Sequence, residues 1–449
     1  MATARLCVRL MAAALLLPAA SLCGPAGAQT LPQSPAAYPD ICEADDDESA
    51  KPVPLWKRFA WEGACISLSG TLSGVYQKQR ASANRIPLIA SRQGGVLTGV
   101  NRLGTLDASL RVDAERKLGP GKLSTGFEVQ YEKTTADGGN GAVTLTEWIT
   151  TWDFEKRGSA NVGYTDSQMN FWAGDFQFTA TAPSRTVGLA GYTFVLTDAW
   201  SFSLAYETGV PTSRAGANDF APLYFDDPVG SVKLAYENDD TSFQLAAMVH
   251  QLSTGGANRL TALLQPPPSP TRELGWAVTA GLTLPVKLGE EGSAFSSQVT
   301  YAVNASPYLG TAADASTLAG SIGVPVSTRG WSAVGSYHHV FSKHWEANVM
   351  ASYLALDIEI GPQQPSIRTT RYAANLIYKP IEGLNIGAEA GYLKGRFETA
   401  GLTGIFDPLF SGQAGARPGL PLSAPVLNTG ARGIRGDGLI GYLFVTYEF

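Results

Sequence analysis

The last twelve residues, Gly438 to Phe449, read G-L-I-G-Y-L-F-V-T-Y-E-F and end the chain on an aromatic side chain. Polarity alternates along this stretch, with Leu443, Val445 and Tyr447 on one face and Thr446 and Glu448 on the other. A period of two predicts a β-strand with two different faces, and it is the pattern of strands in transmembrane β-barrels. A soluble sheet shows the same alternation but seldom sustains it along a whole chain.

The opposite end of the chain reads as an export signal. Arg5 and Arg9 precede an apolar run from Leu10 to Leu22, and the small residues Ala26-Gly27-Ala28 follow it. A basic start, an apolar centre and a small-residue exit are typical of a secretory signal peptide. Residues 1–28 are therefore predicted to be removed, and the mature chain to begin near Gln29.

A lipoprotein signal is the alternative interpretation of this end. Cys23 lies in the tail of the apolar run, where a lipid-bearing cysteine would be expected. Leu22, directly before it, is bulkier than the residue that a good lipidation site carries. The sequence thus favours a cleaved signal peptide.

Composition narrows the class of the exported chain. Beyond the signal, no stretch approaches the about 18 to 20 uncharged apolar residues of a spanning helix, so the chain is predicted to be either soluble or a barrel. Without Arg5 and Arg9, 31 of the 33 Lys and Arg remain against 39 Asp and Glu, a net charge of −8 that argues against nucleic-acid binding. The 49 Gly, 17 Tyr, 18 Phe and 9 Trp suit many short strands, tight turns and aromatic belts.

Residues 29–64 are predicted to form a periplasmic extension ahead of a barrel that spans residues 65–449. Two cysteines remain after the signal, Cys42 and Cys65, and an oxidising compartment predicts one disulfide between them. The run Asp45-Asp46-Asp47-Glu48 is interpreted as a solvated segment. A divalent cation site is the alternative, but no spaced ligand loop accompanies the run.

Alternating segments of about ten residues recur from Cys65 onward, and sixteen of them are predicted to be strands. An even number is what a single-chain bacterial barrel with both ends in the periplasm requires. The fold class is therefore all-β, a transmembrane antiparallel β-barrel of 16 strands. The predicted strands are Ile66–Gln77, Thr105–Lys117, Lys122–Lys133, Val143–Phe154, Ala160–Thr165, Val187–Leu196, Trp200–Glu207, Val229–Glu237, Ser242–Gln251, Leu274–Val286, Phe295–Ala305, Trp331–Phe341, Trp345–Ile358, Thr370–Ile381, Leu384–Phe397 and Gly438–Phe449.

Connection lengths alternate as well, which predicts short periplasmic turns and long extracellular loops. The short links include residues 119–121, 197–199, 238–241, 342–344 and 382–383. The long links, rich in Gly, Ser and Pro, are residues 78–104, 209–228, 252–273, 306–330 and 398–437.

Strand alternation also predicts which charged residues face the lumen. Acids outnumber bases ten to four in this set, and carboxylate rings attract cations, so a weak cation preference is expected. Arg111 and Arg371 are the candidates for a basic wall opposite an inner loop. The inward-facing residues are predicted to be Asp107, Arg111, Asp113, Glu115, Glu128, Glu132, Glu147, Asp153, Lys233, Glu237, Glu346, Arg371, Lys379 and Glu389.

Several segments together resemble the alphaproteobacterial porin family. They are the spacing of Cys42 and Cys65 before a Gly/Ser-rich first strand, the stretch N-V-G-Y-T-D-S at Asn161–Ser167, W-S-F-S-L at Trp200–Leu204, and the terminal Phe449. The acidic, Pro-containing segment between the cysteines departs from that family's Gly- and aromatic-rich stretch. The resemblance implies that Phe449 is the signal read by the barrel-assembly machinery.

The resemblance also implies a homotrimer in which the third outer loop folds into the lumen and narrows it. By strand order this pore constriction loop is Asp166 to Arg185 and contains Phe171, Trp172, Asp175 and Phe176. A sixteen-stranded lumen is wide enough to need such a constriction. Asp166 and Asp175 are expected to set the local field, or Asp166 caps a turn and only Asp175, or neither, faces the solute.

The function expected from these features is a passive diffusion pore for small hydrophilic solutes and ions, integral to a Gram-negative outer membrane. Its expected partners are outer-membrane lipid, lipopolysaccharide and the barrel-assembly machinery, without nucleic acid, cofactor or metal. Two alternatives stay open. One is a substrate-selective nutrient channel, for example for sugars, and the other is an adhesin or binding protein that uses the barrel as an anchor.

An enzyme is not expected, and no catalytic residue is predicted. The chain has four histidines, His250, His338, His339 and His344, and no Gly-x-Ser-x-Gly elbow that follows a strand and opens a helix. His338 and His339 are neighbours on a predicted strand, so their side chains point to opposite faces and cannot both reach one metal ion without distortion.

Overall fold

The computed structural model describes sixteen stretches of the chain. They are residues 58–61, 64–81, 86–87, 96–97, 100–118, 121–135, 141–154, 157–178, 180–208, 229–238, 241–253, 272–288, 292–310, 326–360, 364–398 and 434–449. The predicted signal peptide, Cys42, the acidic run and most of the long outer loops lie outside these residues.

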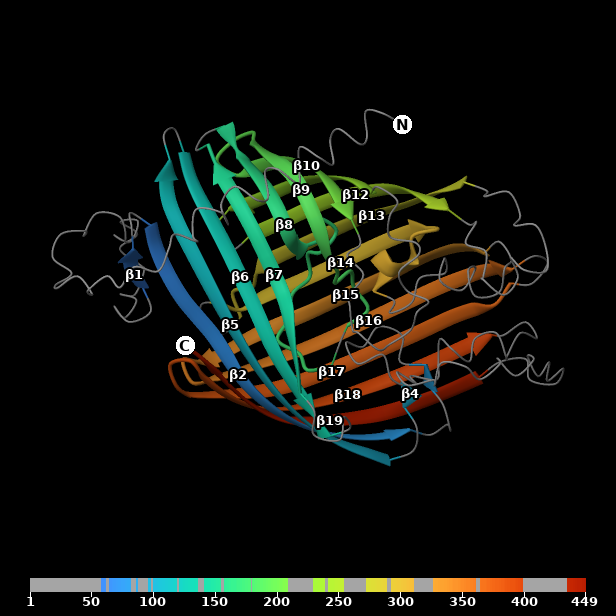
Figure 1. Cartoon of the computed structure of the whole chain (residues 1–449). Coiled ribbons are helices and arrows are strands. Elements are labelled where there is room, and N and C mark those ends of the chain that lie inside the picture. Colours follow the sequence, from blue (N-terminus) through green and yellow to red (C-terminus); the bar gives the residue numbers. More distant parts are fainter. Residues whose placement is uncertain are drawn as a thin grey trace.

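Sixteen strands form a closed antiparallel barrel (Figure 1). Each strand pairs with the next, and the last strand, β19, pairs with the first, β2, which closes the ring. The strands are β2 (Ala64–Ala81), β5 (Val100–Leu118), β6 (Gly121–Thr134), β7 (Gly141–Asp153), β8 (Ser159–Asp166), β9 (Thr186–Val195), β10 (Trp200–Thr208), β11 (Val229–Asn238), β12 (Thr241–Ser253), β13 (Arg272–Pro285), β14 (Ala294–Val303), β15 (Val326–Ser342), β16 (Trp345–Ile360), β17 (Ser366–Ile381), β18 (Leu384–Glu398) and β19 (Ile434–Glu448).

Four short elements of the described residues lie outside this ring. β1 (Arg58–Trp61) pairs with the start of β2, on the same edge that β19 pairs with further along. β3 (Ile86–Pro87) and β4 (Val96–Leu97) pair with each other in the connection between β2 and β5. A 3-10 helix, Ser306–Leu309, follows β14.

The predicted strand number and order are confirmed, and each predicted segment corresponds to one barrel strand. The boundaries differ most at the ends next to the long links. β15 begins at Val326, five residues before the predicted Trp331, and β5 begins at Val100, five before Thr105. Ladder hydrogen bonds continue there beyond the alternating stretch, because two paired strands satisfy each other's backbone whatever their side chains are.

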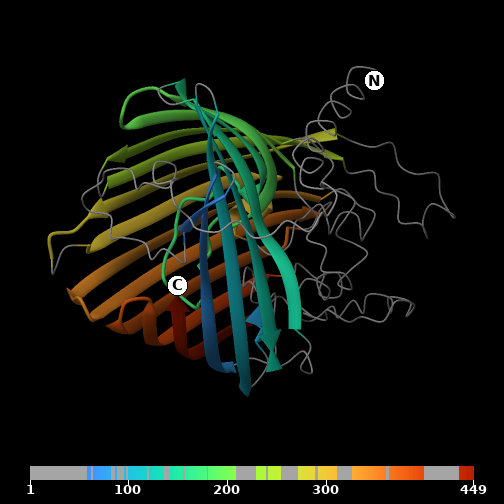
Figure 2. The same ribbon diagram turned by 60° about the vertical axis from the view of Figure 1, so that its left-hand side comes forward.

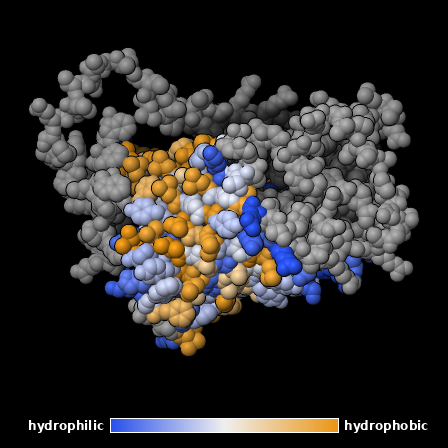
Figure 3. Space-filling view, turned by 90° about the horizontal axis from the view of Figure 1, so that it is seen from below, coloured by the Kyte–Doolittle hydropathy of each residue, from blue (hydrophilic) through white to orange (hydrophobic). Residues whose placement is uncertain are grey.

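Apolar side chains cover the outside of the barrel. The exposed large hydrophobic residues include Leu72, Phe127, Tyr206, Val249, Leu376 and Leu443, each on the face opposite to the polar one of its strand. Figure 3 shows apolar side chains gathered over one outer face of the described wall. In lipid this apolar surface is removed from water, and lipid is the environment that its composition suits.

Among the described residues, no helix is long and apolar enough to cross a membrane.

Barrel closure brings Phe449 against Gly70. The amide N–H of each residue donates to the carbonyl oxygen of the other, at 3.0 and 3.1 Å. A Cβ atom on Gly70 would lie 2.6 Å from the Phe449 ring and 2.4 Å from the Ser109 carbonyl oxygen. Only glycine therefore lets the terminal ring and the neighbouring strand approach β2 so closely.

The first prediction concerns this contact. Gly70→Val is expected to lower the free energy of unfolding by about 1 to 3 kcal/mol, the usual cost of forcing extra atoms into a packed site. Urea unfolding of the lipid-refolded barrel measures it. Gly74→Val is the matched control on the same face of β2, because nothing lies within 4 Å of a Cβ atom there. Equal unfolding curves for the two variants would contradict the role of the Gly70 contact.

Candidate functional site

The segment between β8 and β9, residues 167–185, runs inside the barrel (Figures 1 and 2, green). Its described residues contact inward-facing side chains of β10, β11, β12, β14, β15, β16, β17 and β18. We call these residues the inner loop. Because its described residues form no sheet, many of its backbone groups hydrogen-bond to side chains of the wall.

A fully buried carboxylate on β10 holds the start of the inner loop. Glu207 accepts hydrogen bonds from the Ser167 hydroxyl at 2.7 Å, from the Gln168 N–H at 3.0 Å and from the Ser231 hydroxyl at 2.7 Å. Its exposed fraction is 0%. A buried carboxylate is stable only when its oxygens accept such bonds, so Glu207 and the loop fix each other.

Two glutamines of the wall continue this attachment. The Gln244 side-chain amide on β12 donates to the Gln168 carbonyl at 2.8 Å, and that of Gln298 on β14 donates to the Met169 carbonyl at 2.9 Å. Gln298 also accepts from the Trp172 N–H at 2.8 Å. An amide side chain both donates and accepts, which matches it to a loop backbone that presents both kinds of group.

A second carboxylate, Glu389 on β18, holds the middle of the loop. It accepts from the N–H groups of Gln177 at 2.8 Å and Phe178 at 2.6 Å, and it is 5% exposed. Asn375 on β17 donates to the Asp175 carbonyl at 2.5 Å. The predicted wall residue Glu389 thus lies beneath the loop and binds it.

The underside of the inner loop is apolar. Phe178, Ala180 and Ala182 pack in one cluster with wall residues Val334, Met350, Ala373, Leu393 and Ile440. Trp172, Phe176 and Tyr442 pack against this cluster. Burial of these side chains adds the hydrophobic effect to the hydrogen bonds that hold the loop.

The predicted role of Arg371 in a basic wall is wrong. It points inward from β17, as predicted, but its exposed fraction is 0%, and its guanidinium lies 5.7 Å from the centre of the Phe178 ring. The inner loop covers it, so Arg371 belongs to the support of the loop and does not form a basic wall opposite to it. Alternation along a strand predicts which side of the wall a residue faces. It does not predict which segment covers that side.

The end of the inner loop returns to its start. The Asn170 side chain donates to the Arg185 carbonyl at 3.0 Å and accepts from the Arg185 N–H at 3.1 Å. The Arg185 guanidinium lies 4.9 Å from the centre of the Tyr308 ring, in the 3-10 helix after β14. These contacts close the neck of the loop at the wall.

The predicted acids of the loop lie in different places. Asp175 is exposed at the tip of the loop beside Ala173 and Gly174. Asp166 is the last residue of β8 and follows Thr165, whose hydroxyl contacts an inward carboxylate. By alternation, the Asp166 side chain therefore faces away from the lumen. Asp166 and Asp175 do not lie together.

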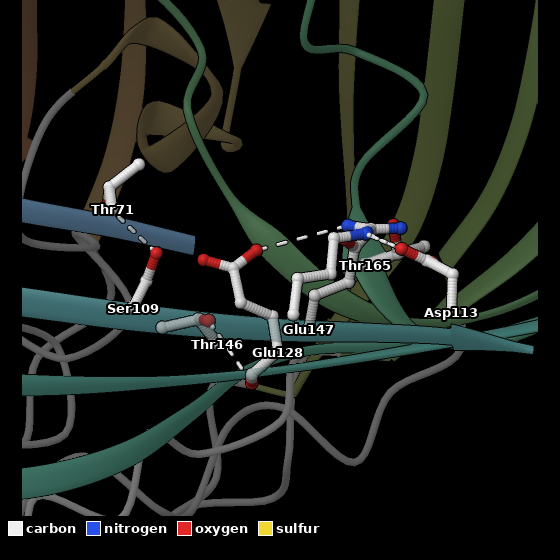
Figure 4. Close-up of polar contacts among 8 residues, drawn as sticks. Thr71, Ser109, Asp113, Glu128, Thr146, Glu147 and Thr165 are labelled. Carbon is white, nitrogen blue, oxygen red and sulfur yellow. Dashed lines mark hydrogen bonds and ion pairs between the residues drawn. The ribbon is translucent and has the colours of Figure 1, made fainter. Parts of the chain in front are cut away.

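A charged cluster occupies the other side of the lumen, on β5, β6 and β7. Arg111 contacts Asp113 at 2.9 Å, Glu128 at 3.9 Å and Glu147. Thr165 donates to Glu147 at 2.6 Å. In Figure 4 the side chains of Asp113, Glu128 and Glu147 project from these neighbouring strands into the same region. Three carboxylates thus surround one guanidinium.

Two local features of the strands build this cluster. A Cβ atom on Gly126 would lie 2.8 Å from the Arg111 guanidinium, so glycine leaves the space that the arginine crosses from β5 toward β7. A β-bulge inserts Thr146 between Leu145, which pairs with Val129, and Glu147, which pairs with Glu128. The bulge shifts the alternation by one residue and turns Glu147 inward.

The two sides of the lumen differ in exposure. The side chains of Arg111, Asp113, Glu128 and Glu147 are between 25% and 33% exposed. Glu207 and Arg371 are fully buried. Charges on β5 to β7 are therefore reached by solvent, whereas those beneath the inner loop serve as its attachment.

The remaining predicted residues have other surroundings. Asp107 pairs across the sheet with Glu132, both on the inner face. His338 faces the lumen, with its Nε2 3.6 Å from a Glu346 oxygen, whereas His339 accepts or donates a 2.8 Å bond with the outward Tyr337 hydroxyl. Within the described ranges, no group of three His, Cys, Asp or Glu residues is arranged to hold a metal ion.

Cys65 is disulfide-bonded. Its predicted partner, Cys42, lies outside the described residues, so the pairing stays a prediction.

Known proteins match this chain in fold but not closely in sequence. No family model matches the sequence, and no curated protein matches it. Among solved structures, the outer membrane channel DcaP of Acinetobacter baumannii superposes with a TM-score of 0.57 at 17% identity, covering 87% of this chain and 99% of that one. The anion-selective porin from Comamonas acidovorans has a TM-score of 0.48 at 12% identity, covering 86% and 100%.

The chain has the fold of an outer-membrane channel. The closed barrel, its apolar outer surface and the likeness to DcaP agree on this point. A closed barrel with an apolar outer surface is the form of an integral, multi-pass membrane β-barrel.

Sequence reasoning missed the residues that attach the inner loop, namely Glu207, Gln244, Gln298, Asn375 and Ser352. Each is an inward-facing polar residue with exposure of 6% or less. The sequence carries one signal of them, which is long polar side chains at inward positions of β10, β12, β14 and β17. It does not show that a loop lies over them.

The second prediction concerns this attachment. Glu389→Ala leaves the N–H groups of Gln177 and Phe178 without their acceptor, at a cost of about 1 to 3 kcal/mol for each buried group. Hydrogen exchange at these two amides is expected to accelerate, measured by mass spectrometry on the lipid-embedded barrel. Glu115→Ala is the control, because Glu115 pairs with Lys122 at 3.5 Å and is 41% exposed. Unchanged exchange in Glu389→Ala would show that the carboxylate does not hold the loop.

Proposed function

We propose that the protein is a porin, a passive diffusion pore for small hydrophilic solutes and ions. The proposal rests on the difference between the two sides of the lumen. The inner loop occupies one side of it, and solvent-reached polar and charged side chains line β5 to β7 on the other. A loop that fills part of a wide barrel lumen narrows it without closing the polar side. The solute's own gradient drives transport.

We further propose a weak preference for cations. Arg111 neutralises only one of the three carboxylates around it, and the tip of the inner loop adds the exposed Asp175. A solute between the two therefore meets a net negative potential. The roles of Phe171, Trp172, Asp175 and Phe176 as constriction residues belong to this proposal.

The oligomeric state and the family of the protein are proposed as well. The resemblance of Asn161–Ser167, Trp200–Leu204 and the terminal Phe449 supports membership of the alphaproteobacterial porin family. That membership would bring a homotrimer, lipopolysaccharide contacts and recognition of Phe449 by the barrel-assembly machinery. Cross-linking of the protein in outer-membrane vesicles tests the trimer.

The third prediction tests the pore itself. Purified protein, refolded and inserted into a planar lipid bilayer, is expected to give stepwise conductance, with a reversal potential in a salt gradient that favours cations. Steps in groups of three would support the trimer as well. A folded, heat-modifiable barrel without conductance would contradict the porin proposal.

The fourth prediction tests the origin of the field. Arg111→Gln removes the one positive charge of the cluster and leaves Asp113, Glu128 and Glu147, so the cation-to-anion permeability ratio is expected to rise about two- to fivefold at low salt. The rise is expected to shrink as salt increases, because ions screen exposed charges over about 10 Å at 0.1 M. Lys122→Gln at the periplasmic rim is the matched control, with little change expected. An unchanged ratio in Arg111→Gln would remove this cluster from the selectivity of the pore.

A further inference from the structure

A small cavity lies between the inner loop and the wall. Its volume is about 290 Å³, and the loop contributes Phe171, Ala173, Gly174, Asp175 and Phe176 to its lining. The wall contributes Ser242, Thr283, Ala294, Ser296, Ser336, His338 and Asn348, from β12 to β16. These wall residues lie near the strand ends that join through the short turns, so the cavity is on the short-turn side of the loop, which the proposed topology places toward the periplasm.

The aromatic rings of this cavity are held in fixed positions. A Cβ atom on Gly281 would lie 2.1 Å from the Phe171 ring, so this ring packs directly on the backbone of β13. Trp172 donates from its indole nitrogen to the Ser336 hydroxyl at 2.9 Å and stacks with Phe176 at 6.1 Å between ring centres. The ring of Phe171 is half-buried and lines the cavity, so it offers a rigid apolar surface there.

The opposite lining is rich in hydroxyl and amide groups. Ser336 accepts from Trp172, and its own proton therefore remains available for donation. Thr283 and Ser296 share one 3.1 Å hydrogen bond, which leaves further acceptor capacity on both oxygens. Among the described residues that line the cavity, Asp175 alone has a fixed charge. Asp175 is exposed, and its backbone carbonyl accepts a hydrogen bond from Asn375.

We propose that this cavity binds one ring of a neutral sugar on its way through the pore. A pyranose has two apolar C–H faces and a rim of hydroxyl groups, so it matches an aromatic surface next to hydroxyl, amide and carboxylate groups. Small-molecule sites usually begin at about 300 Å³, so the cavity takes a single ring and not a longer saccharide. The lining carries too little charge to favour a strongly charged ligand.

This site deepens the proposed function and rests on it for its role in transport. As a binding site, however, it is independent of conductance. A sugar that passes the inner loop meets Asp175 and the Phe171 ring together at the cavity. Weak, saturable binding at that point raises the local sugar concentration and favours sugars over other solutes of the same size.

The test uses the full-length protein in a planar bilayer, with D-glucose added to the periplasmic side and sorbitol as the open-chain comparison. Glucose is expected to reduce the ion current in a saturable way, and sorbitol only through its effect on bulk conductivity. Phe171→Leu is expected to raise the half-saturating glucose concentration about threefold to tenfold, the usual worth of an aromatic contact. Asp175→Asn is expected to raise it as well. Phe127→Leu, on the lipid side, is the matched control with no change expected.

Equal effects of glucose and sorbitol, or equal half-saturation in Phe171→Leu and the unaltered protein, would overturn the proposal. A second measurement separates it from the porin proposal. Saturation-transfer NMR on the detergent-folded barrel detects glucose binding without any current. Saturable binding that Phe171→Leu weakens would support the sugar site even if the bilayer shows no conductance, and absence of binding would overturn the site even in a conducting pore.

Discussion

The need to pair every backbone group of a wall that lies in lipid is the constraint on which the structure depends. Lipid offers no hydrogen bonds, so an open strand edge would leave a row of unpaired N–H and carbonyl groups. Pairing of β19 with β2 removes both edges at once. The mutual hydrogen bonds of Gly70 and Phe449 extend this pairing to the last residue of the chain. The closed ring then separates an apolar outside from a polar inside on every strand.

A closed barrel of sixteen strands has a lumen wider than its side chains can fill. The inner loop occupies part of this space. The loop has no sheet of its own, so the wall supplies acceptors and donors at the places where its backbone needs them. Glu207 and Glu389 are acceptors for N–H groups, and Gln298 serves both kinds of group. Each carboxylate loses its water when the loop covers it, and the hydrogen bonds from the loop compensate for that loss. Wall and loop therefore stabilise each other.

The sequence alone predicts the barrel because its main signal is periodic and local. The sixteen strands and the apolar outer face are read from alternation, and the short and long connections follow from the same segments. The site is harder to predict because it depends on contacts between distant residues. Alternation places Arg371 and Glu389 on the inner face, but no local pattern shows that Phe178, about two hundred residues earlier, covers them. The bulge at Thr146 is likewise invisible to a strict period of two, although it lets Leu145 face outward while Glu147 faces inward.

In the proposed pore, two ways of choosing a solute are separated. Charge acts from the wall, where Arg111 fixes Asp113 and Glu147 in an ion-pair network that spans β5 to β7. Shape acts from the inner loop, where Phe171 and Trp172 are held by Gly281 and Ser336 on the opposite wall. Because the two groups sit on different elements, one can change without disturbing the other. Asp175 is the exception, since its carboxylate belongs to the field of the lumen and to the lining of the cavity at the same time. The two proposals together therefore require that a change of its charge alters ion preference and sugar contact, whereas a change at Arg111 alters ion preference alone.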